Sequence, residues 1–117
     1  MDIAAAVDSL NMYKNILSDI KPNGYQKTLE KITHLISCLP VYMFDKSGAI
    51  KEWSMNEYKE NNAHRHISHL YCAWPSSETQ HNHALASACR QAIINRNREN
   101  TGKDDTASHG WIHKALV

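Results

Sequence analysis

Hydrophobic residues recur at steps of three and four through the first forty positions of the chain. The first stripe predicts a helix over residues 2–20 with one apolar face, formed by Ile3, Val7, Leu10, Tyr13, Leu17 and Ile20. Pro22-Asn23-Gly24 ends this helix, because proline and glycine disfavour its continuation. A second stripe stops at Pro40 and consists of Tyr25, Leu29, Ile32, Ile36 and Leu39. The short connection predicts two antiparallel neighbouring helices.

The pattern changes after Pro40. Residues 41–53 contain two short apolar segments around Asp45-Lys46-Ser47-Gly48, a tetrapeptide typical of a turn. This predicts a short β-hairpin or extended loop near 41–53 that presents Glu52 and Trp53 at a defined place. Residues 54–63 are polar and predict an exposed loop.

Helical patterns return in the second half of the chain. A short helical turn is expected from about Ser68 to Trp74, and a third helix from about 80 to 97. The apolar positions of that third helix are Leu85, Ala88, Cys89, Ala92 and Ile93. Ser108 is a plausible N-cap for a last helix. The predicted fold class is therefore all-α, built from antiparallel helical hairpins.

The apolar end of the last helix bears on domain organisation. Its side chains need another surface to bury against, and they are Trp111, Ile112, Ala115, Leu116 and Val117. The predicted helices have narrow apolar stripes, and the stretch between 40 and 80 has no evident core of its own. We therefore expect residues 1–117 to form a single partial domain, a slice of a larger helical array.

Composition and charge narrow the function classes. The chain is 42% hydrophobic and 21% charged, as in ordinary globular proteins. A net charge of +1 gives no electrostatic case for nucleic-acid binding. No apolar run approaches the ~18 residues of a membrane span, and residues 1–10 lack the features of a secretory signal. The chain as it stands is expected to be cytoplasmic, with no membrane partner.

The cysteines do not suggest a disulfide framework. Cys38, Cys72 and Cys89 are odd in number, widely spaced and form no CxxC pair. Reduced thiols are therefore favoured. Cys38 and Cys89 fall within apolar helical patterns, where cysteine behaves as a small hydrophobic residue.

The strongest candidate for chemistry is HRHISHLY, residues 64–71, which we call the histidine segment. In an extended chain His64 and His66 project to one side, whereas in a helix His66 and His69 do. A change from extended to helical near residue 67 would bring all three together, and zinc accepts three imidazoles. Against a metal, Arg65 would place a positive charge beside the cation, and no acidic pair or CxxC lies nearby.

Two other interpretations compete with the metal site. Arginine and histidine offer donors and acceptors for a hydroxyl-rich substrate, and further polar and aromatic groups nearby are Glu52, Trp53, Tyr71 and Trp74. Alternatively, the segment is structural, with Arg65 and Ser68 tying the loop to helix ends and the histidines partly buried. The residues alone leave all three interpretations open.

The order of motifs along the chain adds a family resemblance. These motifs are Leu39-Pro40, Gly48, Glu52-Trp53, the histidine segment, Pro75, an alanine-rich helix over 84–92 and Gly110-Trp111. Together they resemble the family 95 glycoside hydrolases, α-L-fucosidase-like enzymes of which some act on α-L-galactosides. The resemblance spans essentially the whole chain. It departs from the family pattern after Trp111, where Ile112-His113-Lys114 follow, so it assigns no role to His109 or His113.

The resemblance implies a segment of an (α/α)6 barrel that hydrolyses terminal α-L-fucosides with inversion. Inversion uses two carboxyl groups about 6.5–9.5 Å apart. In this family the acid is a glutamate upstream of the matched region and the base an aspartate downstream, so no catalytic residue is expected in residues 1–117. The segment would supply part of the sugar-binding wall. Arg65 and His66 would contact the sugar, with direct or supporting roles for His64, His69, Glu52 and Trp53.

The resemblance also sets the expected partners. These are a fucosylated oligosaccharide or glycan, and the remainder of the catalytic domain or an oligomeric partner that covers the apolar faces. No metal or cofactor is expected, and the chain alone is expected to be inactive. The alternative functions are a non-catalytic helical binding or assembly module, and a small zinc-binding protein built on His64, His66 and His69.

Overall fold

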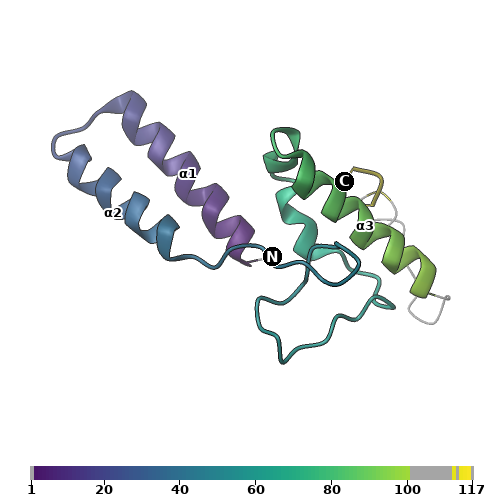
Figure 1. The fold of residues 1–117 in the computed structure, drawn as a ribbon. Helices are drawn as coiled ribbons and strands as arrows, with labels where there is room; N and C mark the ends of the chain where they lie inside the picture. The colour runs from purple at the N-terminus through teal and green to yellow at the C-terminus, as the bar shows by residue number, and fades with distance from the viewer. Residues whose placement is uncertain (1, 101–111, 113, 117) are drawn as a thin grey trace. The chain divides into compact units, whose positions relative to one another are not determined.

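A computed structural model describes residues 2–100, 112 and 114–116 (Figure 1). Its helices are α1 (Asp2–Ile20), α2 (Tyr25–Cys38), η1 (Ser68–Cys72), η2 (Glu78–Gln80) and α3 (His83–Glu99). Within the described ranges the β structure is limited to one isolated antiparallel bridge, between Phe44 and Ile50. The predicted all-α fold class is thus confirmed. Residues 2–40 form one compact unit, and the described residues from Val41 onward belong to a second.

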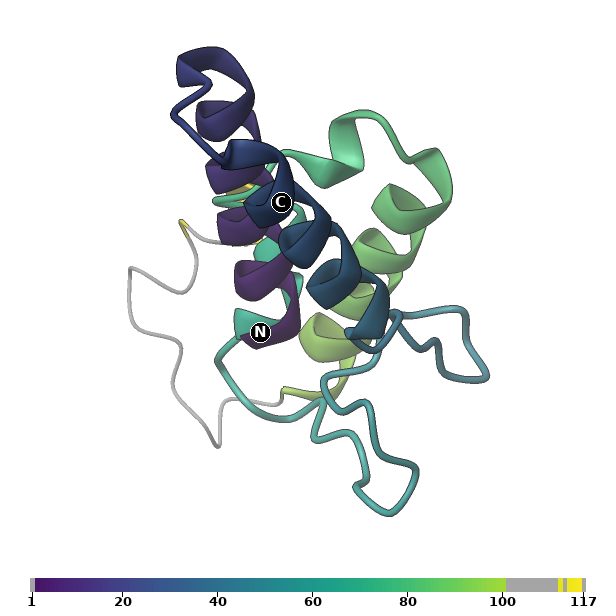
Figure 2. The same ribbon diagram turned by 90° about the vertical axis from the view of Figure 1, so that its left-hand side faces the viewer.

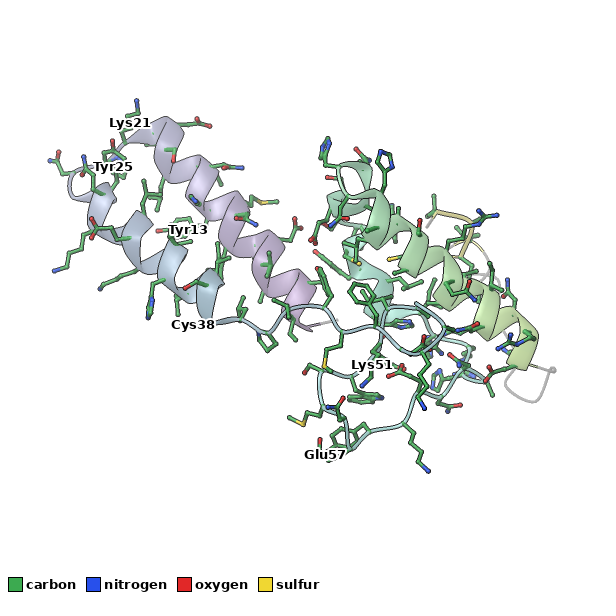
Figure 3. All side chains as sticks on the ribbon, in the orientation of Figure 1. Tyr13, Lys21, Tyr25, Cys38, Lys51 and Glu57 are labelled. Atoms are coloured by element: carbon green, nitrogen blue, oxygen red, sulfur yellow. The ribbon has the colours of Figure 1, made fainter. Side chains whose placement is uncertain are left out.

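The first unit is the predicted helical hairpin. Figures 1 and 2 show α1 and α2 side by side and antiparallel, and Figure 3 labels Lys21 and Tyr25 on either side of the turn. The turn is closed by the Tyr25 amide, which donates to the Pro22 carbonyl at 3.0 Å. Gly24 adopts φ 76°, in the left-handed region where glycine is favoured. The predicted boundaries of both helices agree with the structure to within a residue.

The apolar stripes of this hairpin are only partly buried. Leu17 and Ile32 are buried, whereas Tyr13 and Ile20, both on the predicted stripe of the first helix, are exposed. Met12, Ile16 and Leu35 are exposed as well. Two helices can offer each other only one narrow seam, so the rest of each apolar face stays open within this unit.

The second unit begins with the predicted turn. One carboxylate oxygen of Asp45, Oδ1, accepts from the Ser47 amide and hydroxyl, both at 2.7 Å, and from the Ala49 amide at 3.0 Å. Gly48 has φ 81°, which glycine adopts without strain. The flanking residues pair through the Lys51 amide and the Met43 carbonyl at 2.8 Å. The short β-hairpin or extended loop expected near 41–53 is thus a turn with one isolated antiparallel bridge, between Phe44 and Ile50.

Helix α3 is the central element of the second unit. It begins at His83 rather than near residue 80, because the short helix η2 precedes it and Asn82 caps it through a bond from the Leu85 amide to Asn82 Oδ1. One face of α3 is buried and carries Leu85, Ala88, Cys89, Ala92, Asn95 and Arg96. Further buried residues of this unit come from the turn and the η1 region, namely Ala49, Ile50, Ile67, Leu70 and Cys72.

Two predictions about individual residues need correction. Cys38 is exposed rather than packed as a small hydrophobic residue, because its position falls between Ile36 and Leu39 and off the apolar stripe of α2. Ile93 is only half-buried, since the buried face of α3 turns toward Ala92 and Arg96.

The last predicted helix is described only in part. Residues 112 and 114–116 are helical, while the predicted N-cap Ser108 and the residues around Trp111 lie outside the described residues. Within the described ranges, none of the helices has the length and hydropathy needed to cross a bilayer.

Candidate functional site

Arg96 of α3 organises the loops of the second unit. Its side chain is 1% exposed. The Nη1 group donates to the carbonyl oxygens of Asn61 at 3.2 Å and His64 at 2.8 Å, and Nη2 donates to Glu52 Oε2 at 2.9 Å. A single guanidinium therefore attaches both Glu52 and the first residue of the histidine segment, His64, to α3.

The sequence places Arg96 in this buried position. It follows Leu85, Cys89 and Ala92 at steps of four, three and four, so it lies on the buried face of α3. Burial of a charge is costly unless the charge is paired and hydrogen-bonded, and Glu52 with the two carbonyls supplies that pairing. The Nε atom of Arg96 is buried without a hydrogen-bond partner. Arg96 was not among the predicted site residues, although its spacing from the apolar positions indicates a place on the buried face of α3.

Glu52 was predicted to support sugar binding. In the structure its carboxylate forms an ion pair with Arg96. The Glu52 side chain is 25% exposed. Its backbone amide donates to Glu60 Oε2 at 2.8 Å, which brings the two ends of the 52–60 loop together. The other oxygen of Glu60, Oε1, is buried without a partner. Glu52 thus attaches the loop to α3 through its ion pair with Arg96.

Arg65 and His66 lie on the surface, at the start of the histidine segment. The His66 amide donates to His64 Nδ1 at 3.0 Å, and Arg65 Nε donates to His66 Nε2 at 3.4 Å. The rings of His64 and His66 are tilted, with their centroids 5.0 Å apart. In both contacts a ring nitrogen is the acceptor, so the two histidines and Arg65 are joined in one local set of hydrogen bonds.

His69 does not join this pair on the surface. It lies in η1 and is 4% exposed, and its Nδ1 is buried without a hydrogen-bond partner. Burial, with the positive charge of Arg96 as a second cause, lowers the pKa of His69 to about 3. In the described part of the chain, no group of three or more His, Cys, Asp or Glu side chains is arranged to hold a metal ion. The structure therefore lends no support to the convergence of all three histidines on zinc.

An aromatic pair lies on the 52–60 loop. Trp53 and Tyr58 have ring centroids 5.1 Å apart at an interplanar angle of 35°, and about half of each side chain is exposed. Lys51 and Glu57, labelled in Figure 3, mark this stretch, and Lys51 Nζ reaches Asn56 Oδ1 at 3.3 Å. Trp53 was a predicted site residue. Tyr58 was not, because no local pattern indicates that its ring contacts Trp53.

A second group of titratable residues lies around η1 and η2. The Tyr42 hydroxyl donates to Glu78 Oε2 at 2.7 Å, and burial together with this bond raises the pKa of Tyr42. The thiols of Cys72 and Cys89 are in contact at 3.6 Å. None of these four residues was a predicted site residue.

A cavity of about 550 Å³ opens along α3 beside the residues of the last helix. Its lining mixes cationic and apolar side chains, including Arg90, Ile93, Ile94 and Lys114. Lys114 Nζ donates to Asn97 Oδ1 at 3.1 Å, and burial, followed by the charge of Arg96, lowers the pKa of Lys114.

The histidine segment carries hydrogen-bonding side chains at the surface of the second unit. Arg65 and His66 are exposed in this segment, and Trp53 and Tyr58 are about half exposed on the 52–60 loop. The carboxylate of Glu52 is paired with Arg96 Nη2 at 2.9 Å. These features define an all-α protein with a fixed, polar, hydrogen-bonding surface.

Comparison with known families identifies the chain. The family model of the glycosyl hydrolase family 95 catalytic domain matches residues 4–114. This match covers nearly all of the chain, so the chain belongs to that family, and it is a segment of a glycoside hydrolase. The resemblance drawn from the sequence motifs is confirmed, and the all-α fold is consistent with a segment of an (α/α)6 barrel. Comparison with curated proteins gives no match.

Proposed function

We propose that this chain supplies part of the sugar-binding wall of a catalytic domain that hydrolyses terminal α-L-fucosides or α-L-galactosides with inversion. Membership in family 95 supports a glycan substrate. In this proposal residues 1–117 form a single partial domain, and both the acid and the base are contributed from outside them. The chain by itself binds sugar without cleaving it. The remainder of the domain, or an oligomeric partner, covers the apolar faces.

The exposed pair of Arg65 and His66 on a fixed backbone is the observation that carries this proposal. Arg96 binds the carbonyl of His64 at 2.8 Å, directly before the pair. His64 in turn accepts the amide of His66. Sugar hydroxyls need donors and acceptors that are already in place, because ordering them on binding reduces affinity. The bonds from Arg96 and His64 hold the backbone of the histidine segment in place, and the side chains of Arg65 and His66 are exposed to solvent.

Each predicted site residue then has a distinct task. Arg65 and His66 bind hydroxyl groups of the sugar, and Trp53 offers an aromatic face to the apolar side of the ring. His64 positions His66 through the backbone. Glu52 positions the loop through Arg96, and His69 packs beneath the segment as a neutral imidazole. None of these tasks requires a cofactor or a metal.

A titration of the 117-residue chain with L-fucose and L-galactose, followed by amide NMR spectra, tests the proposal. We expect the largest shift changes at residues 64–71 and their loss in Arg65→Ala and His66→Ala. Arg98→Ala is the matched control, because Arg98 is an exposed arginine of α3 outside the histidine segment. Sugar-induced shifts that persist in both site variants would contradict the assignment.

An activity assay tests the second half of the proposal. The isolated chain is expected to show no turnover of fucosyl or galactosyl substrates. Turnover above that of the His66→Ala variant would show that residues 1–117 contain their own acid and base.

The alternatives give different results in two measurements. A non-catalytic module would bind sugar equally well, yet a longer chain extended into the flanking coding sequence would still lack activity. A zinc protein would carry stoichiometric metal in elemental analysis of the purified protein, and that result would replace the sugar-wall proposal.

A further inference from the structure

Two buried cysteines of the second unit contact each other across different elements. Cys72 ends η1 and Cys89 lies in α3. Their Sγ atoms are 3.6 Å apart, and the two residues are 0% and 1% exposed. The third cysteine, Cys38, lies on the surface of α2. Nothing in the sugar-wall proposal uses this thiol pair.

We propose that Cys72 and Cys89 form an oxidisable dithiol, which a two-electron oxidant of the peroxide class converts into a disulfide between η1 and α3. A disulfide has an Sγ–Sγ distance of about 2.05 Å, so the two sulfurs must approach by roughly 1.5 Å. The side chains already meet across neighbouring elements, which leaves only this small closure. The proposal is independent of sugar binding.

The reaction is balanced with hydrogen peroxide as the oxidant. The Cys72 thiolate attacks one peroxide oxygen, the O–O bond breaks, and the product is a sulfenic acid with release of hydroxide, which is protonated to water. The Cys89 sulfur then attacks the Cys72 sulfur, the S–O bond breaks, and a second water leaves. Two thiols and one peroxide thus give one disulfide and two waters.

The surroundings assign the first step to Cys72. The hydrogen bond from the Cys89 thiol lowers the pKa of Cys72, whereas the same contact, followed by burial, raises the pKa of Cys89. The thiolate is the reactive form. The carboxylate of Glu78 disfavours both thiolates, which moderates the reactivity of the pair.

Because both thiols are buried, an oxidant can reach them only when the surrounding structure opens. Cys72 is in a 3-10 helix whose Leu70 has non-helical backbone angles, φ −88° and ψ 17°. Such short helices have poorer hydrogen bonds than α-helices, and local opening exposes buried groups without global unfolding. Oxidation of the pair is therefore expected to be slower than that of the exposed Cys38, and to depend on opening of η1.

A disulfide at this position would restrain the histidine segment. Tyr71 is the last residue of that segment and Cys72 follows it directly. Arg96 already attaches the start of the histidine segment to α3 by hydrogen bonds. The disulfide would add a covalent attachment to α3 at the end of the segment. Cross-linking residues 17 apart also reduces the freedom of the unfolded chain. We expect the melting temperature to rise by roughly 5–15 °C.

The test uses the Cys38→Ser variant, which removes the exposed thiol and leaves the buried pair intact. After treatment with hydrogen peroxide, the intact mass should fall by two hydrogen atoms, and a reductant should reverse the change. Trypsin leaves both cysteines in one peptide, since neither lysine nor arginine occurs between Arg65 and Arg90. A glutamyl endopeptidase cuts at Glu78, between the two cysteines, so the resulting peptides should stay joined until they are reduced.

The control variants add Cys72→Ala or Cys89→Ala to Cys38→Ser, and neither should give joined peptides. In a Cys89→Ser version of this control, which keeps a hydroxyl donor beside Cys72, a sulfenic acid at Cys72 should be trapped by dimedone. Amide exchange of residues 64–71 should slow in the oxidised Cys38→Ser protein. Oxidation of that protein to sulfinic acids without joined peptides would overturn the proposal. Two thiols that stay reduced even after exposure far longer than Cys38 of the wild type needs, under conditions that allow η1 to open, would overturn it as well.

Discussion

Different kinds of interaction stabilise the interior of each of the two units. In residues 2–40 the described side-chain hydrogen bonds are local, such as Ser18 to the Lys14 carbonyl and Ser37 to the His34 carbonyl. Leu17 and Ile32 provide apolar burial along the seam. In the second unit, by contrast, buried polar groups join positions far apart in sequence, with Arg96 reaching Glu52 and Asn95 reaching Ser47.

This difference follows from where the backbone hydrogen bonds go. In α1 and α2 the backbone groups satisfy one another inside each helix. The stretch from Val41 to Ile67 has almost no regular structure, so its buried carbonyls and amides need partners from side chains. Arg96 and Asp45 supply such partners. The second unit therefore depends on individual polar residues, whereas the hairpin depends on a repeated pattern.

Replacement of Arg96 by methionine should have the largest effect. It removes the cation and leaves the Glu52 carboxylate and the carbonyls of Asn61 and His64 without their partner. Loss of one member of a buried pair costs about 3–5 kcal/mol. We expect this loss in the free energy of unfolding measured with urea, together with faster amide exchange across residues 60–67.

Arg98→Met is the matched control for that prediction. Arg98 is on the same helix, but its side chain is 66% exposed and its ion pair with Glu99 is at the surface. Surface pairs contribute little, so the expected change is within about 0.5 kcal/mol. Equal costs for the two variants would show that the second unit does not depend on Arg96.

The pH dependence of stability is the second prediction and concerns His69. Burial lowers its pKa from 6.5 to about 3 in the folded chain. Between these values the unfolded chain binds a proton that the folded chain does not, so stability falls as the pH falls from 6.5 toward 3. The slope for one proton is at most about 1.4 kcal/mol per pH unit.

Urea unfolding of the wild type and of His69→Gln at several pH values measures this effect. Glutamine is neutral at every pH. The unfolding free energy of the variant should therefore depend less steeply on pH between 6.5 and 3, by the slope that corresponds to about one proton. Identical slopes for the two proteins would mean that His69 takes up its proton in the folded state, contrary to its buried position.

Asn95 gives a third and smaller effect. Its side-chain amide donates to the Ser47 hydroxyl at 2.8 Å and accepts from Gln91 Nε2 at 3.0 Å. Asn95→Ala should cost about 1–2 kcal/mol. In a double-mutant cycle with Ser47→Ala, the two losses should not add, because both remove the same bond between the turn and α3. If the losses of the two single variants add up to that of the double variant in thermal or urea unfolding, the bond between Asn95 and Ser47 does not stabilise the contact between the turn and α3.

The same contrast explains what the sequence could predict. Helices α1, α2 and α3 follow from apolar spacing, and the turn at Asp45–Gly48 from its residue types, because those signals are local. The order of motifs was enough to identify the family. The link between Arg96 and Glu52 could not be predicted, since it depends on which loops pack against α3. His69 was grouped with His64 and His66 because the spacing alone does not show which side of the segment faces the interior.

The smallest predicted effect compares one glycine from each unit. Gly24 and Gly48 have φ values of 76° and 81°, and an added Cβ would meet no atom within 4 Å at either position. Gly24→Ala and Gly48→Ala should each cost about 1 kcal/mol, because an L-residue is strained in this backbone region. Urea unfolding and amide exchange in the first turn of α2 measure the change at Gly24. If the cost at Gly48 clearly exceeds that at Gly24, the excess belongs to the bonds that Asp45 and Ser47 make around that turn, since local strain alone predicts equal costs.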